Sequence, residues 1–318
     1  MDKNTIERMR KFFPERAEAW GKLSEGGISF AKYTSASTAR DIISNKELWL
    51  RNTAVMNDYS EIDYGLNLIR KALDKDNSAG IGFFAALDSV FPTSLKGLPQ
   101  DIDLEVKKLK NENETYITCL SHHEESEEKH GRLSMWRAYG DTALILSCQP
   151  MKYSTAELGV FSTPVTYRCQ NDFEQELVRL SKSIKENKDD LVQLGCETVR
   201  LVVLEFFFDT AIASKHPGFA EEKEWRIFHR PSRYPYKILK KKIKVIDGIA
   251  QVVWVLPLEH NPDNGLHDAD VPSLIEQVII GPTRHPEISR RAFVSLLEDA
   301  EVSNAEEKVI CSEIPVRL

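Results

Sequence analysis

Residues 116–148 have the sequence YITCLSHHEESEEKHGRLSMWRAYGDTALILSC, and this stretch decides the fold class. Its two ends, 116–120 and 142–148, are apolar and rich in β-branched side chains, as buried strands are. A strongly polar loop at 122–130 and the compact signature Met135-Trp136-Arg137-Ala138-Tyr139-Gly140 lie between these ends. The stretch therefore predicts two buried strands joined by a polar connection.

The rest of the chain alternates between strand and helix patterns. Further strands are expected at 28–33, 48–50, 165–168, 221–228, 243–249, 252–256, 275–280 and 309–314. Helices are expected at 5–22, 38–45, 60–73, 171–209 and 286–297, with a break near Gly195 and only short helical pieces in 77–113. The sequence thus predicts an α+β fold with a mixed, mainly antiparallel sheet and flanking helices. We expect an N-terminal helical extension over 1–27 and a single α+β domain over 28–318, with a helical insertion around 171–209.

Composition limits the class of protein. The chain has 318 residues, of which 42% are hydrophobic, so it can bury a core without help. Its net charge of −7 opposes broad nucleic-acid binding but leaves a local basic patch open. Five scattered cysteines, none in a C-x-x-C pair, favour reduced thiols over a disulfide framework or zinc site. With no apolar run of membrane-spanning length and no signal-peptide pattern, we expect a cytoplasmic protein that avoids membranes.

Three clusters place polar side chains where strands begin or end, which is the usual place for a site on a sheet. They are Tyr33-Thr34-Ser35, Trp136-x-x-Tyr139-Gly140 and Glu222-x-Glu224-Trp225-Arg226. If residues 221–228 are extended, Glu222 and Glu224 project from one face of the strand. Two carboxylates so placed can raise each other's proton affinity, or one can stabilise a developing cation.

Each cluster also has a purely structural interpretation. Trp136 and Trp225 are typical core aromatics, Gly140 can serve a turn, and the segment from Glu222 to Arg226 can be a salt-linked strand. Asn57, Asp58 and Glu61 suit a helix N-terminus. His122, His123 and His130 lie on a polar loop without fixed ligand geometry, so no metal is expected.

Read in order, a set of short motifs resembles a bacterial domain family of unknown function that includes abortive-infection proteins of the AbiGi type. The motifs are Lys32-Tyr33-Thr34-Ser35, Leu48-Trp49-Leu50, Met56-Asn57-Asp58-x-x-Glu61, Cys119-Leu120-Ser121, Met135-Trp136-x-x-Tyr139-Gly140 and Glu222-x-Glu224-Trp225-Arg226. The resemblance implies a bacterial defence context, with Asn57, Asp58, Glu61, Ser121 and Arg226 as further polar site candidates. A macromolecular target or a partner protein of a defence system is implied in the same way.

A more distant resemblance is to ADP-ribosyltransferases, and it implies NAD as the cofactor. In that picture Tyr33, Thr34 and Ser35 meet the nicotinamide ribose, and Tyr139 stacks on nicotinamide. Trp136 and Gly140 are further candidates for binding the cofactor. Glu224 stabilises the oxocarbenium-like transition state, and Glu222 is the first acid of an E-x-E pair. The chain departs from that family at Lys32-Tyr33, where an arginine or histidine is usual.

The expected function is a defence effector that transfers ADP-ribose from NAD to a macromolecule. One alternative is a non-catalytic sensor or partner-binding domain whose recognition core is Trp136, Tyr139 and Trp225. Another is a metal-dependent nuclease built on Glu221-x-Lys223 with Asp58 or Glu61 as an additional acid. The sequence leaves the oligomeric state open.

Overall fold

The structure is a computed structural model that describes residues 27–55, 60–112, 114–147, 158–233, 238–246 and 248–315, together with residues 18, 21 and 236. Asn57, Asp58 and nearly all of the expected extension over 1–27 lie outside the described residues, as do the side chains of Ser60 and Glu61. The chain divides into two compact units. The helical unit takes residues 1–21, 56–113 and 164–220, and the sheet unit takes 22–55, 114–163 and 221–318.

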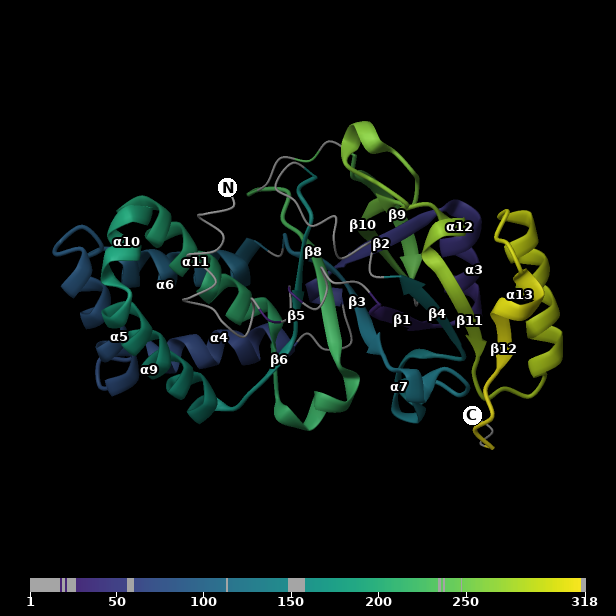
Figure 1. Cartoon of the computed structure of the whole chain (residues 1–318), viewed down its shortest axis with the longest axis horizontal. Helices are drawn as coiled ribbons and strands as arrows, with labels where there is room; N and C mark the ends of the chain where they lie inside the picture. Colours follow the sequence, from purple (N-terminus) through teal and green to yellow (C-terminus); the bar gives the residue numbers. More distant parts are fainter. Residues whose placement is uncertain are drawn as a thin grey trace. The chain divides into compact units, whose positions relative to one another are not determined.

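The helical unit consists mainly of helices (Figure 1). Its helices are α4 (Ser60–Ala72), α5 (Ser78–Val90), α6 (Leu98–Glu112), α9 (Gln170–Glu186), α10 (Lys188–Leu194) and α11 (Cys196–Ala213). A short parallel pair, β6 (Thr166–Tyr167) and β7 (Ser214–Lys215), belongs to the same unit. Phe173, Phe206 and Phe207 are buried in contact with one another. The segment expected as a helical insertion is helical, and the break near Gly195 is confirmed because that glycine has a φ of +84°.

Residues 77–113 are more regular than the sequence suggested. They form two full helices, α5 and α6, rather than short helical pieces joined by loops. Asn77 begins α5 by accepting a hydrogen bond from the Gly80 amide at 3.0 Å, and Phe83 and Leu87 then face the core. Tertiary burial of one face stabilises a helix that the mixed composition of this segment does not reveal.

The sheet unit contains a mixed, mainly antiparallel sheet, which confirms the predicted α+β class. Its strands are β1 (Ser29–Thr34), β2 (Glu47–Asn52), β3 (Tyr116–His123), β4 (Thr142–Ser147), β5 (Phe161–Pro164), β8 (Glu224–His229), β9 (Lys240–Ile246), β10 (Ile249–Pro257), β11 (Ile275–Ile280) and β12 (Val309–Cys311). The main order is β12-β11-β4-β1-β3-β2-β10-β9, with β8 pairing to both β3 and β5. Only β11 and β12 pair in parallel along this order.

Short helices complete the sheet unit (Figure 1). They are α3 (Ala36–Asn45), α7 (Leu133–Tyr139), α12 (Val271–Leu274), α13 (Pro286–Asp299) and α14 (Ala305–Lys308). The Ser35 hydroxyl caps α3 by accepting a hydrogen bond from the Thr38 amide at 3.3 Å. Lys46, with a left-handed φ of 53°, ends that helix and turns the chain into β2. The predicted strand, helix, strand unit at 28–50 is therefore confirmed.

Helix α7 lies against β1 through a small apolar cluster. The cluster comprises Ala31, Tyr33, Met135, Trp136, Ala143, Ile145 and Ile279. The Trp136 and Tyr33 rings meet edge to face at 4.8 Å, and the indole nitrogen of Trp136 donates to the His130 carbonyl at 2.8 Å. These contacts fix the end of α7 beside the end of β1.

Gly140 makes this junction possible. Its φ is +133°, and a Cβ at this position would lie 2.5 Å from the Thr34 carbonyl oxygen. We predict that Gly140→Ala lowers the free energy of unfolding by about 2 kcal/mol or more, because backbone strain and a backbone clash act together. Gly82→Ala is the control, since nothing lies within 4 Å of a Cβ there. Urea denaturation of both variants checks the prediction, and equal midpoints would contradict it.

Candidate functional site

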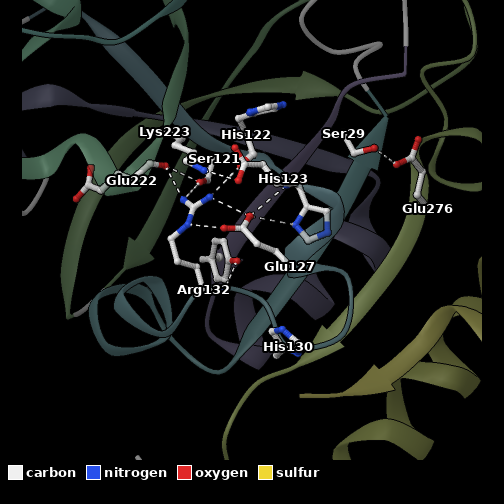
Figure 2. A network of polar contacts seen from close by, with 12 residues as sticks. Ser29, Ser121, His122, His123, Glu127, His130, Arg132, Glu222, Lys223 and Glu276 are labelled. Atoms are coloured by element: carbon white, nitrogen blue, oxygen red, sulfur yellow. Dashed lines mark hydrogen bonds and ion pairs between the residues drawn. The ribbon is translucent and has the colours of Figure 1, made fainter. Parts of the chain in front are cut away.

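Arg132 is the centre of a polar network in the sheet unit (Figure 2). Its guanidinium forms two hydrogen bonds to the Glu127 carboxylate, from Nε at 2.7 Å and from Nη2 at 2.9 Å. It also donates to the Ser121 hydroxyl at 2.7 Å and to the main-chain oxygens of His122 and Glu222, both at 3.1 Å. Arg132 is buried, so its charge depends on this full set of acceptors.

Three hydrogen bonds hold Glu222 in the network around Arg132. Glu222 ends the 3₁₀ helix η3 (Pro217–Glu222). Its main-chain oxygen accepts from the Ser121 hydroxyl at 2.5 Å and from Arg132, and its side-chain Oε1 accepts from the Tyr139 hydroxyl at 3.2 Å. Glu222 and Tyr139 are both half-buried. The result is a positioned carboxylate that keeps access to solvent.

The expectation that Glu222 and Glu224 share one strand face is wrong. Lys223 has a left-handed φ of 45°, so the chain turns between the two acids and β8 begins only at Glu224. Lys223 instead reaches Glu124, with Nζ and Oε2 2.5 Å apart, and this ion pair lowers the pKa of Glu124. The Glu221-x-Lys223 pattern of the nuclease alternative therefore has its lysine engaged with Glu124.

Glu224 is a buried ion-pair partner. Its carboxylate accepts from Arg226 Nε at 2.7 Å and from Nη2 at 3.2 Å, and the Arg226 side chain is 1% exposed. The Cys119 thiol also hydrogen bonds to Glu224, and burial together with this carboxylate raises the pKa of Cys119. Glu224 thus neutralises an arginine inside the sheet.

Tyr33 positions Arg132. Its hydroxyl accepts a hydrogen bond from the Arg132 amide at 2.9 Å. Burial, reinforced by the charge of Glu127, raises the pKa of Tyr33 to about 12, so the phenol stays neutral at physiological pH. Because Tyr33 is buried, its hydroxyl supports the main chain at Arg132 from inside the core.

The remaining predicted residues take different places. Trp136 is in the core, whereas Thr34, Ser35 and Gly140 form the close backbone junction at the end of β1. Trp225 contacts Phe30 with ring centroids 5.6 Å apart. Phe30 and Tyr33 point to opposite faces of β1, so Trp225 and Trp136 do not form one aromatic group. Glu61 is in α4 of the helical unit, and Asn57 and Asp58 lie outside the described residues.

The histidines of residues 122–130 do not converge as the ligands of a metal ion would. Within the described part of the chain, no group of three or more histidine, cysteine, aspartate or glutamate side chains has the geometry to hold a metal ion. His123 Nδ1 lies 3.8 Å from Glu127 Oε2. Burial lowers the pKa of His123, although the charge of Glu127 opposes that shift.

Sequence reasoning missed Arg132 and Glu127. A single arginine among 42 basic residues carries no signal of its own. The only available clue is that Arg132 precedes the Trp136-x-x-Tyr139-Gly140 motif by four positions, close enough to share its local fold. Glu127 sits in the polar loop, where an acidic side chain is unremarkable.

Part of the chain matches the model of a protein family. Residues 135–227 match the family DUF2971, a protein of unknown function. The DUF2971 segment begins at Met135 in α7 and ends at Ile227 in β8, so it contains both Tyr139 and Glu222. No curated protein and no solved structure matches the chain. Among the described helices, none has the length and apolarity needed to cross a bilayer.

Proposed function

We propose that this chain is a bacterial defence effector that cleaves NAD and transfers ADP-ribose to a macromolecule, with Glu222 as its essential carboxylate. The observation that carries the proposal is the contact between the Tyr139 hydroxyl and the half-buried Glu222 carboxylate at 3.2 Å. We assign the stabilisation of the transition state to Glu222 and not to Glu224, because Glu224 is buried against Arg226. The defence setting rests on the motif resemblance to abortive-infection proteins.

The chemistry requires a fixed negative charge beside the ribose. The bond between ribose C1′ and the nicotinamide nitrogen breaks, and its electron pair neutralises the pyridinium ring. The remaining oxocarbenium-like cation is stabilised by a carboxylate until a nucleophile of the target bonds to C1′ and releases its proton. Glu222 meets this need because Tyr139 holds its side chain while Ser121 and Arg132 hold its main chain.

The test is nicotinamide release from NAD by the purified protein in the presence of a cell extract. We expect Glu222→Gln to lower the rate by about 10²- to 10³-fold, because the amide keeps the shape and loses the charge. Glu221→Gln is the matched control, since Glu221 is an exposed neighbour in the same 3₁₀ helix. Unchanged release by Glu222→Gln, or no release by the wild-type protein, would overturn the proposal.

A second candidate is a non-catalytic sensor domain. It is favoured by the observation that Nε, Nη1 and Nη2 of Arg132 all donate to groups of the protein itself. A network in which these three nitrogens all have acceptors within the protein can serve to fix the shape of a binding surface. The two candidates separate in one experiment, because a sensor predicts that Glu222→Gln keeps biological activity while no NAD is consumed.

A further inference from the structure

Strand β9 lies at one end of the strand order and carries exposed apolar side chains. β9 ends the main strand order and pairs along its whole length with β10. Among the strands that the structure describes, none pairs with the other edge of β9. An edge strand presents unpaired main-chain N–H and C=O groups that another extended chain can use.

One face of β9 carries exposed apolar side chains next to the exposed Lys241. Ile243 is 77% exposed and Val245 is 71% exposed, and both point to the same face because they are two residues apart. Exposed aliphatic side chains along a free sheet edge are typical of a surface that another chain covers.

Two lysines of β9, Lys242 and Lys244, point away from this face. Lys242 forms an ion pair with Glu47, and Lys244 lies over the Trp49 ring at 4.4 Å from its centroid. Lys242 and Lys244 occupy the alternate positions, so they point to the face opposite Ile243 and Val245. Lys242 and Lys244 are therefore folded back onto the sheet, whereas the exposed Lys241 lies on the face of Ile243 and Val245.

We propose that β9 is a docking edge for an extended acidic segment of a partner protein, which adds to the sheet as a further strand. Main-chain hydrogen bonds supply affinity in this mode, and alternate side chains supply specificity. Lys240 and Lys241 are exposed and make this edge basic within a chain of net charge −7. Acidic side chains of the partner complement that charge, while its apolar side chains cover Ile243 and Val245.

The charges of β9 disfavour a second copy of the chain. Antiparallel pairing of two β9 strands centred on Ile243 would place Lys242 opposite Lys244, and like charges directly opposite are destabilising. A nucleic acid is also less suited to this surface. Phosphates would contact lysines, two of which already have internal partners, and would leave Ile243 and Val245 exposed.

The test uses the full chain and a synthetic peptide as long as β9, 7 residues, in which aspartate or glutamate alternates with valine. We expect saturable binding in a fluorescence anisotropy titration, together with slower amide hydrogen exchange in β9. Ile243→Asp is expected to weaken binding at least about tenfold, by charge repulsion and loss of apolar contact. Ile288→Asp is the control, because Ile288 in α13 is similarly exposed at 68%.

Each of the following outcomes would contradict the proposal. Absence of binding, or equal binding by Ile243→Asp and the wild-type protein, would remove β9 as the docking edge. Tighter binding of single-stranded DNA than of the acidic peptide would assign the edge to nucleic acid. Dimerisation that Ile243→Asp abolishes, without peptide binding, would assign it to a second copy. None of these results depends on NAD cleavage.

Discussion

Replacing Arg132 with alanine is expected to lower the free energy of unfolding by about 3–5 kcal/mol. The change leaves the Glu127 carboxylate, on a side chain that is 13% exposed, without its bidentate partner. It also removes a donor from the Ser121 hydroxyl and from the carbonyl groups of His122 and Glu222. An uncompensated buried charge and several lost acceptor contacts act in the same direction.

Urea denaturation of the whole chain measures this effect. Arg40→Ala is the matched control, because Arg40 forms a surface ion pair with Asp41 and its side chain is 63% exposed. We expect the control to change stability by less than about 1 kcal/mol. Arg132→Lys should recover only part of the loss, since an ammonium group cannot reproduce the planar bidentate contact. Equal denaturation midpoints for Arg132→Ala and the wild type would show that the network is dispensable.

Glu224→Ala is expected to be destabilising by a similar amount, about 3–5 kcal/mol, because it strands the buried Arg226 guanidinium inside the sheet. Glu224→Gln should cost less, since an amide oxygen can still accept one of the two hydrogen bonds. The double change Glu224→Leu with Arg226→Met should restore most of the stability, because no buried charge is left unpaired.

Thermal unfolding of the single changes Glu224→Leu and Arg226→Met, together with the double change, gives a double-mutant cycle. A large coupling energy between positions 224 and 226 is the expected result, and simple additivity would rule out a buried pair. Asp103→Ala with Lys107→Ala provides the comparison, because that pair is on the surface of α6 with side chains 50% and 64% exposed. Its coupling should be small.

The sequence determined much of the fold because the relevant signals are local. Alternation of apolar side chains over 28–33 and 116–120 predicts strands, and both are present as β1 and β3. The break at Gly195 depends on residues within a few positions of each other. Pattern reasoning also selected Tyr33, Tyr139 and Glu222, which the structure brings to one place.

Only the tertiary structure decided which carboxylate is available and which arginine organises the site. Ser121 and Glu222 are 101 positions apart, and Tyr33 and Arg132 are 99 apart, so their contacts depend on strand register rather than on neighbouring residues. One left-handed residue, Lys223, separated two acids that alternation alone would have placed together. Burial of Glu224 and exposure of β9 likewise follow from where each strand falls in the sheet, and that order is a property of the whole fold.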